Sequence, residues 1–574
     1  MEKAEKGKTF NYYLSECREQ VENSLSELEL KSIPERIWKK DFTIWSNKPD
    51  EISNRLGWLN SPDTSLSLAD EINSFVQAVI KEGFTQALLL GMGGSSLAPE
   101  VFHYSFGVKK GYLSLEVLDS THPETVLDYS NRYDPSTTLY IVSTKSGGTV
   151  ETFSLMKYFY NLTIEKLGKE NSGRHFVAIT DPGSGLESTA RKLNFRKIFL
   201  NDPDIGGRYS ALSLFGIVPA ALIGVDIVKL LNSARTEAEA SKNQDIKENV
   251  SAVLGVILGE MANCGKDKAT FITSSQLYYF GGWVEQLIAE STGKSGKGIL
   301  PVIGEEIFSP ENYSNDRLFI HLHLTGDHNY DSKVLALIDA GQPVVEFALN
   351  DMYDIGREFF RWEIATAIAS WRMGITPFDQ PNVESAKILA RKMVQEYKEK
   401  GKLPELIPTI IENDIIVYST EPAKSIEFAF HELFEIMNKK DNSKPRAYVS
   451  VQAYLARNKN IDEELQNFRI AIQLKYKTAV TVGYGPRFLH STGQLHKGDS
   501  GNGIFIQFIS SVKKDAAIPD EAGDSASSMS FGVLIKSQAL GDREALIEGK
   551  RKIITFDLGN EPEKAIHHLT DIIK

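Results

Sequence analysis

The chain has 574 residues, of which 41% are hydrophobic and 24% charged, as is typical of a globular protein with a large buried core. Its formal net charge of −12 argues against nucleic acid as the main partner, although local basic residues can still attract an anionic small molecule into a cleft. No run of about 18 apolar residues occurs, so we expect no membrane-spanning helix and no membrane partner.

The opening segment and the cysteine content bear on the cellular compartment. The first 20 residues are charged and lack the apolar stretch of a signal peptide. Cys17 and Cys264 are the two cysteines of the chain, so no disulfide framework stabilises the fold. Both features predict a cytoplasmic protein.

The patterns of apolar residues divide the chain into four segments. Residues 1–75 show the apolar spacing of helices, and we expect a helical N-terminal segment there. Five apolar runs then alternate with helix-length segments, which predicts a parallel, doubly wound α/β sheet within residues 76–235. These runs are 85–91, 114–120, 138–144, 175–180 and 196–201.

The same alternation occurs twice more. Residues 236–400 predict a second α/β domain, with strands at 269–275, 298–303, 317–324 and 342–349. Residues 401–574 predict a smaller third α/β domain, with strands at 414–420, 447–455, 478–485, 503–510 and 552–559. Ligands of open α/β sheets bind beyond the carboxyl ends of the strands, so we expect a site in the loops at those ends.

Glycines and small hydroxyls follow the first strand, in the stretch LLLGMGGSSLAPEVF (88–102). A tight turn is one explanation, because glycine tolerates positive φ and close packing. An anion site is the other, because N–H groups at a helix start and the hydroxyl of Ser95 would face a phosphate that approaches Gly94 unobstructed. The stretch by itself fits both interpretations.

A second loop of this kind, VSTKSGGTVETF (142–153), follows the third strand. Its hydroxyls include those of Thr144, Ser146, Thr149 and Thr152, and two glycines free the backbone between them. This combination at a helix start suits a phosphate. The alternative is a polar helix cap with Thr149 as the N-cap. Two such loops in one sheet favour the phosphate interpretation.

Three further stretches hold candidate catalytic side chains. Arg208 follows two glycines, and its fixed guanidinium fork would stabilise an oxyanion if this loop lines a cleft. Gln286 and Glu290 are four residues apart, so a helix places both on one face, with Glu290 near its end in a position that suits a general base. Gln380 and Lys387 are seven apart and lie on nearly one face. Each of these residues is also consistent with an ordinary solvated position.

Taken in order, these motifs resemble those of the glucose-6-phosphate isomerases, also called phosphoglucose isomerases. That family is built from two SIS-type sugar-phosphate domains, each a doubly wound sandwich, and the resemblance covers roughly residues 80–395. It implies an α/β fold of two SIS domains followed by a smaller C-terminal α/β domain. It also implies substrate-binding roles for Gly94, Ser95, Thr144, Lys145, Ser146, Thr149, Thr152, Gly207, Gln286 and Gln380.

The resemblance also assigns catalytic roles. Glu290, in the motif ESTGK, matches the catalytic base, Arg208 in GGRYS matches the arginine beside the reacting carbons, and Lys387 in QPNVESAK matches the ring-opening lysine. The implied reaction interconverts glucose 6-phosphate and fructose 6-phosphate through an enediolate, in glycolysis and gluconeogenesis. It needs no cofactor, and no metal is expected because no convincing metal-ligand spacing occurs. A homodimer is implied as well.

One feature departs from the family pattern. The family carries a ring-opening histidine upstream of the strand that corresponds to QPVVEFAL, and here the segment DSKVLALIDAG contains none. The third block resembles the C-terminal portion of fused transaldolase–phosphoglucose isomerase proteins, and its stretch RFLHSTGQLHKG contains His490 and His496. We expect one of them, with His490 ranked first, to replace the missing group. The alternative is a tail that only covers the second domain.

Two other functions remain open at this point. A non-catalytic sugar-phosphate sensor built from SIS domains would keep the hydroxyl loops but would not need Glu290, Arg208 and Lys387 together, so the full set argues against it. An isomerase that also acts on mannose 6-phosphate would use the same proton abstraction at C2, and the residues do not distinguish it.

Overall fold

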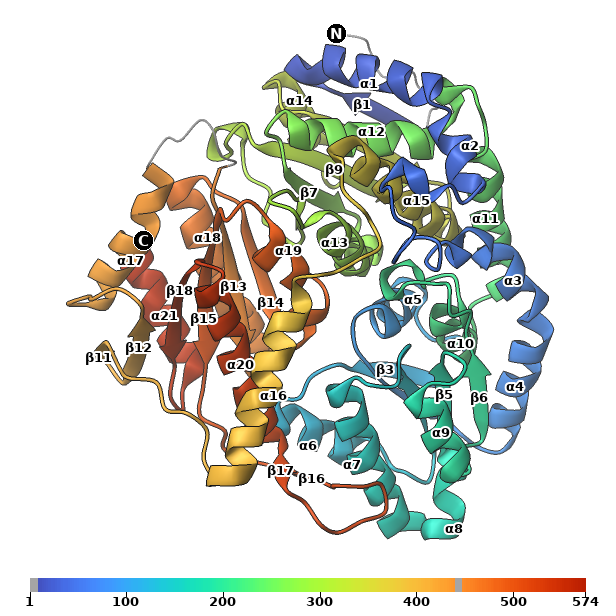
Figure 1. Cartoon of the computed structure of the whole chain (residues 1–574), viewed down its shortest axis with the longest axis vertical. Helices are drawn as coiled ribbons and strands as arrows, with labels where there is room; N and C mark the ends of the chain where they lie inside the picture. The colour runs from blue at the N-terminus through green and yellow to red at the C-terminus, as the bar shows by residue number, and fades with distance from the viewer. Residues whose placement is uncertain (1–8, 439–445) are drawn as a thin grey trace.

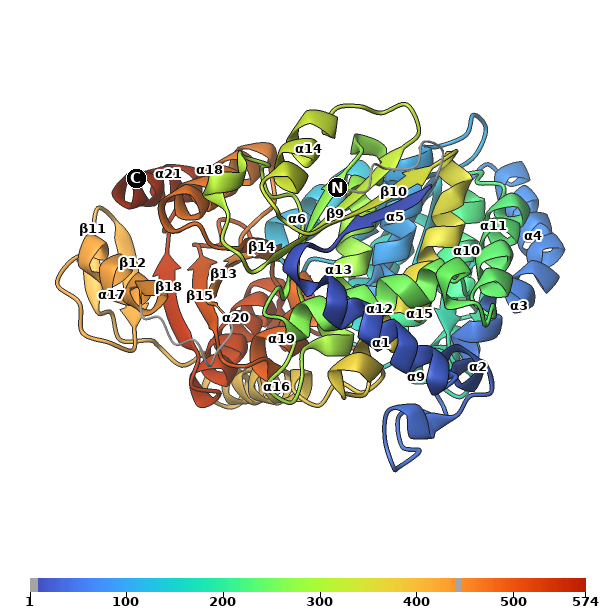
Figure 2. The same cartoon turned by 90° about the horizontal axis from the view of Figure 1, so that it is seen from above.

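The computed structural model describes residues 9–438 and 446–574. Three α/β units lie around a common centre (Figure 1), and the view from above shows that the C-terminal unit packs beside the other two rather than extending away from them (Figure 2). This arrangement confirms the α/β fold predicted from the sequence. Within the described residues, no helix combines the length and apolar character needed to cross a bilayer.

The first sheet is parallel, and its strands lie in the order β3-β2-β4-β5-β6. Their bounds are β2 (Gln86–Gly91), β3 (Ser114–Leu118), β4 (Thr138–Ser143), β5 (Phe176–Thr180) and β6 (Lys197–Leu200). The central strands β4 and β5 are buried along their whole length, as expected for a sheet covered by helices on both faces. The chain passes from β2 to β3 on one side and returns to β4 on the other, so the loops after β2 and β4 meet at a topological switch point.

The helices of this first unit cover both faces of its sheet. They are α3 (Ser61–Ser67), α4 (Ala69–Lys81), α5 (Leu97–Phe106), α6 (Pro123–Arg132), α7 (Val150–Leu167), α8 (Lys169–Ser172), α9 (Gly185–Lys192) and α10 (Leu214–Leu222). Of these, α5 follows the first glycine loop and α7 follows the second. Both hydroxyl-rich loops therefore end at helix N-termini, where free N–H groups are available.

The second sheet has the order β1-β10-β9-β7-β8. Its parallel strands are β7 (Lys268–Thr273), β8 (Leu300–Val302), β9 (Arg317–Leu324) and β10 (Val344–Leu349). The helices of this unit are α11 (Ile227–Ala240), α12 (Val250–Asn263), α13 (Tyr278–Thr292), α14 (Asp331–Asp339) and α15 (Ile355–Met373). The next helix, α16 (Val383–Lys400), packs on α20 (Phe531–Glu548) of the C-terminal unit instead.

The N-terminal segment differs in one respect from the expectation of an all-helical lead-in. Helices α1 (Arg18–Leu30) and α2 (Ile33–Trp38) are present, but they are preceded by β1 (Phe10–Tyr13), which pairs antiparallel with β10. The aromatic run FNYY suits a strand, and Phe10 packs on Phe347 opposite it. A tertiary contact with a distant edge strand thus sets the conformation of this short segment.

The C-terminal sheet has the order β11-β12-β18-β15-β13-β14. Its strands are β11 (Ile410–Glu412), β12 (Ile415–Ser419), β13 (Tyr448–Tyr454), β14 (Val480–Tyr484), β15 (Gly503–Ile509) and β18 (Lys552–Asp557). Its helices are α17 (Ile426–Asn438), α18 (Lys459–Tyr476), α19 (Gly493–Gly498), α20 (Phe531–Glu548) and α21 (Pro562–Ile573). A ribbon of β16 (Ala517–Ile518) and β17 (Met529–Ser530) reaches from this unit onto α7.

Buried apolar side chains form one large core that runs through the helices between the first two sheets, and a separate core fills the C-terminal sheet. The part of the C-terminal unit that touches the first unit joins a third cluster, in which Ile518 and Phe531 pack with Tyr140 and Phe159. The four residue ranges predicted for the domains stay predictions. The first two units share one apolar core, so the core does not define a boundary between them.

A buried ion pair in the second unit generates a stability prediction. Arg317 and Glu305 are both fully buried, and the guanidinium donates to the two carboxylate oxygens at 2.7 and 3.1 Å. Arg317→Met leaves the Glu305 charge buried without its partner, so we expect the free energy of unfolding in urea to fall by about 3–5 kcal/mol. The double variant Arg317→Met, Glu305→Gln should lose less than the single variant.

The matched control is the exposed pair of Arg191 and Glu187, joined at 2.7 Å on α9. Arg191→Met should cost about 1 kcal/mol or less, because water solvates the remaining charge. Equal losses for the buried and the exposed arginine would contradict the prediction.

Candidate active site

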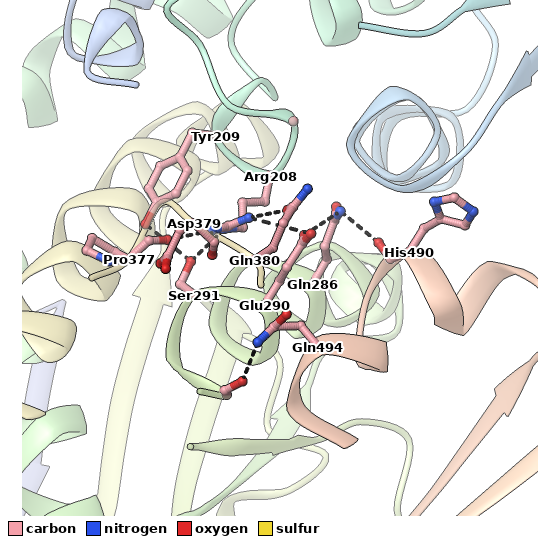
Figure 3. Close-up of polar contacts among 12 residues, drawn as sticks. Arg208, Tyr209, Gln286, Glu290, Ser291, Pro377, Asp379, Gln380, His490 and Gln494 are labelled. Atoms are coloured by element: carbon pink, nitrogen blue, oxygen red, sulfur yellow. Dashed lines mark hydrogen bonds and ion pairs between the residues drawn. The ribbon is translucent and has the colours of Figure 1, made fainter. Parts of the chain in front are cut away.

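Arg208 is the centre of the site. It lies in a single 3-10 turn, Gly207–Tyr209, and is 4% exposed. Its Nε donates to Ser291 Oγ at 2.9 Å, Nη1 donates to Gln380 Oε1 at 2.8 Å, and Nη2 donates to the carbonyl oxygens of Pro377 and Asp379 at 2.7 and 3.0 Å (Figure 3). One buried guanidinium therefore joins three segments of the chain.

Glu290 lies beside this guanidinium, near the end of α13. Its Oε1 is 3.5 Å from Arg208 Nη1, and its Oε2 accepts a hydrogen bond from Gln286 Nε2 at 3.1 Å. The predicted placement of Gln286 and Glu290 on one face of a helix is thus observed. Within the described part of the chain, Gln286 Oε1 is buried without a hydrogen-bond partner, so it can accept from a ligand hydroxyl.

The first glycine loop packs directly on the arginine turn. A Cβ at Gly94 would lie 1.9 Å from the carbonyl oxygen of Gly207, and Gly93 has a φ of +54°. Ser95, in the short turn Gly93–Ser95, is nearly buried. Close packing alone therefore explains the glycine at position 94, as the tight-turn interpretation predicts. Ser95 lies just before the N-terminus of α5, where the anion-site interpretation needs a hydroxyl.

The second loop keeps its hydroxyls near the N-terminus of α7. Thr144 Oγ1 and Thr149 Oγ1 are 3.1 Å apart, and Ser146 is exposed. Thr152 is fully buried, and its hydroxyl has no partner among the described residues. Thr149 stands at the N-cap position, yet its side chain makes no capping hydrogen bond. Apart from the contact between Thr144 and Thr149, no hydrogen bond to the rest of the described chain occupies these hydroxyls.

Lys145 behaves differently from its neighbours. Its Nζ forms an ion pair with Asp181 and donates to the carbonyl oxygen of Pro203 at 2.7 Å. The ammonium group thus braces the second loop against the segments after β5 and β6. Burial raises the pKa of Asp181, and the Lys145 ammonium opposes this effect.

A cavity of about 500 Å³ opens between α7, α16 and the C-terminal unit. It brings together side chains from three distant parts of the sequence. The polar residues that line it include Ser146, Thr149, Glu151, Lys387, His490 and Lys497. Lys387 is partly exposed here, and the nearest carboxylate oxygen is that of Glu384 at 3.9 Å. Its ammonium is therefore not held by a close ion pair.

His490 reaches this cavity from the C-terminal unit. Its Nε2 is 3.0 Å from Glu151 Oε1, which also accepts from Gln538 Nε2 at 2.6 Å. The His490 carbonyl accepts from Gln286 Nε2 at 2.8 Å, while the imidazole turns away from Glu290 (Figure 3). Burial alone would raise the pKa of the Glu151 carboxyl. The charge of His490 and its hydrogen bond lower this pKa by more, so it lies below the ordinary value of a glutamate.

The structure does not bring His496 to the cavity, which corrects its place among the candidates. The His496 side chain is 1% exposed, and its ring packs on Phe505. Its Nε2 lies 3.3 Å from Ser450 Oγ. Burial holds its pKa well below the ordinary value, so the imidazole is neutral and enclosed. The sequence could not separate the two histidines because they lie in the same short motif.

Several residues of the site were not predicted from the sequence. Glu151 is one of them: its Oε1 lies 3.0 Å from His490 Nε2 and orients the imidazole. Lys294, in ESTGK, donates to Asp379 Oδ1 at 2.8 Å, and burial and then the nearby Arg208 charge lower its pKa to about 8. The motif could have indicated Lys294, but nothing local indicated its partner 85 residues away.

Comparison with known proteins shows which sequences and structures this chain is similar to. The family described as "Phosphoglucose isomerase" matches residues 67–299. A probable glucose-6-phosphate isomerase of Methanococcus maripaludis is 30% identical over 385 residues, which span 60% of this chain and 85% of the relative. The glucose-6-phosphate isomerase of Carboxydothermus hydrogenoformans is 27% identical over 431 residues, or 63% and 91% of the two chains.

Two solved structures share the fold. A hypothetical protein from Thermus thermophilus superposes with a TM-score of 0.58 at 24% identity, covering 67% of this chain and 99% of its own. A glucose-6-phosphate isomerase from Chlamydia trachomatis gives a TM-score of 0.57 at 19% identity, covering 68% and 89%. With the sequence matches and the arrangement of Arg208, Gln286 and Glu290, these findings lead to one conclusion: the chain belongs to the phosphoglucose isomerase family.

Proposed function

We propose that this protein interconverts glucose 6-phosphate and fructose 6-phosphate, as a cytoplasmic enzyme of glycolysis and gluconeogenesis. The observation that carries the proposal is the position of the Glu290 carboxylate, which lies between the Arg208 guanidinium and the Gln286 amide. A base next to a fixed cation is what proton transfer through an enediolate requires. The names of the relatives agree with this reaction.

Phosphate binding falls to the two loops at the switch point of the first sheet. The hydroxyls of Ser95, Thr144, Ser146, Thr149 and Thr152 and the N-termini of α5 and α7 supply donors for a dianion. Lys145 acts by holding the second loop in place. The phosphate then fixes one end of the sugar, which orients the other end toward Glu290.

Ring opening moves a proton from the O1 hydroxyl to the ring oxygen. Lys387 and His490 face the same cavity as the second phosphate loop, and Glu151 holds the imidazole by its Nε2. A histidine suits this step because it takes up and releases protons near neutral pH. In this proposal the C-terminal unit supplies the histidine that the segment DSKVLALIDAG does not contain.

Isomerisation follows on the open chain. Glu290 removes the proton from C2 and returns it to C1, while Arg208 stabilises the negative charge of the enediolate. The proton of the O2 hydroxyl passes to O1 within the enediolate, which completes the conversion of the aldose to the ketose. Gln380 holds Nη1 of Arg208, and Gln286 Oε1 accepts from a sugar hydroxyl. A homodimer stays a prediction from the resemblance.

The first test concerns the base. Glu290→Gln keeps the size and the contact with Gln286 but cannot accept a proton, so C2–C1 proton exchange should stop while binding of the sugar phosphate persists. The measurement follows glucose 6-phosphate deuterated at C2 by NMR. Glu285→Gln, on the same helix, is the matched control and should retain exchange. Exchange at the wild-type rate in Glu290→Gln would exclude Glu290 as the base.

The second test concerns the phosphate loop. Thr149→Val removes a hydrogen bond to a charged group, which costs about 1.5–3 kcal/mol, or roughly ten- to a hundredfold in affinity. Fructose 6-phosphate should lose this affinity by titration calorimetry, whereas unphosphorylated fructose should be affected little. Thr163→Val is the control on the same helix. The Thr163 hydroxyl donates to the backbone carbonyl oxygen of Phe159, so both affinities should stay unchanged in this variant. Equal losses for both sugars in Thr149→Val would argue against a phosphate role.

The third test separates ring opening from isomerisation. His490→Ala keeps the backbone carbonyl that Gln286 contacts but removes the imidazole. Turnover of cyclic glucose 6-phosphate should fall strongly. Proton exchange at C2 of erythrose 4-phosphate should change little, because this sugar has no free hydroxyl placed to close a ring. His496→Ala, which perturbs a buried site outside the cavity, should not discriminate between the two sugars. If His490→Ala does not discriminate either, the ring-opening role is wrong.

A further inference from the structure

Gln494 is a buried amide of the C-terminal unit that touches the site without facing the cavity. It lies on α19 and is 0% exposed. Its Nε2 donates to the carbonyl oxygen of Gly293 at 2.9 Å and to Asn382 Oδ1 at 2.8 Å, and its Oε1 accepts from the backbone N–H of Asn382 at 2.8 Å. Both donor hydrogens and the acceptor of one side chain are thus used on two other segments.

These two segments carry the groups proposed to do the chemistry. Gly293 follows α13 directly and lies three residues beyond Glu290. Asn382 lies two residues beyond Gln380 and immediately precedes α16, which carries Lys387. The Gln494 amide, labelled in Figure 3, therefore connects the end of the helix that holds the base to the start of the helix that holds the lysine.

The backbone carbonyl of Gly293 needs such a partner. The carbonyl groups at the end of a helix have no N–H partner within the helix, and a buried one that stays unpaired is destabilising. The space around this carbonyl is filled, because α19 packs tightly on the end of α13. A Cβ at Gly293 would lie 2.3 Å from Leu495 Cα, and a Cβ at Gly498 would lie 2.3 Å from the Gly293 carbonyl oxygen.

We propose that Gln494 is a positioning residue, which fixes Glu290 relative to Gln380 and Lys387. The inference deepens the proposed isomerase function and rests on it. Base catalysis depends steeply on geometry, and a shift of about 1 Å can cost a hundredfold in rate. The C-terminal unit thus sets the distance between the base and the ring-opening lysine, in addition to its supply of His490.

The test compares two buried glutamines of the same unit. Gln494→Ala should lower kcat for glucose 6-phosphate by about 10- to 100-fold. Binding of glucitol 6-phosphate, which cannot react, should change by less than about threefold, because the hydroxyl loops do not contact Gln494. Gln507 is the control: it is 1% exposed, donates to the Ala539 carbonyl at 3.1 Å, and lies in the C-terminal sheet. Gln507→Ala should change the melting temperature with little effect on kcat.

Variants of Asn382 keep the proposal testable if Gln494→Ala folds poorly. Asn382→Asp retains the oxygen that accepts from Gln494 and should retain a kcat near that of the wild type, whereas Asn382→Ala should resemble Gln494→Ala. The loss in the double variant Gln494→Ala, Asn382→Ala should be smaller than the product of the single losses, because both act through one contact.

Three results would overturn the inference: a kcat loss no greater than in Gln507→Ala, a rise in KM at unchanged kcat, or single losses that simply multiply. A wild-type chain that binds glucitol 6-phosphate but converts no glucose 6-phosphate would refute the proposed function together with this inference. An active wild type with any of the three results would refute the role of Gln494 alone.

Discussion

The site depends on the burial of one guanidinium. An arginine removed from water must find partners for its N–H groups, and Arg208 finds them in Ser291, Gln380 and the carbonyl groups of Pro377 and Asp379. Each of these contacts fixes the position of its partner, because the planar guanidinium donates hydrogen bonds only in fixed directions. The turn after β6, the end of α13 and the segment before α16 are therefore placed by the same group that faces Glu290.

The C-terminal unit meets this arrangement through the segment 487–498. Arg487 forms ion pairs with Glu100 on α5 and Asp119 after β3, and the pair with Asp119 is 2.9 Å long. Burial would lower the pKa of Arg487, but the two carboxylates raise it well above its ordinary value, so the charge is retained. His490 and Gln494 follow in the same segment, and they contact Glu151 at the start of α7 and the end of α13. A single short stretch thus connects the main parts of the site.

The sequence predicted the alternation of strands and helices well, because parallel buried strands are apolar along their whole length and glycines mark the loops between them. The pairing of Gln286 with Glu290 was also predictable, since helical spacing alone places them on one face. β1 was not, because four residues at the edge of a sheet form a strand only through a partner more than 300 residues away. The distinction between His490 and His496, and the contacts of Glu151 and Gln494, depend on tertiary packing that no local pattern encodes.

The pairing of Glu151 with His490 joins residues 339 positions apart, and this separation has a consequence for synthesis. Domains fold in the order in which they leave the ribosome, and the first two sheets are complete before the C-terminal unit is made. A nascent chain of this protein already carries the arginine and the base, yet it has neither the imidazole nor the amide of Gln494. Its cavity is closed on that side only when the segment 487–498 docks, so the site matures after the first two units have folded.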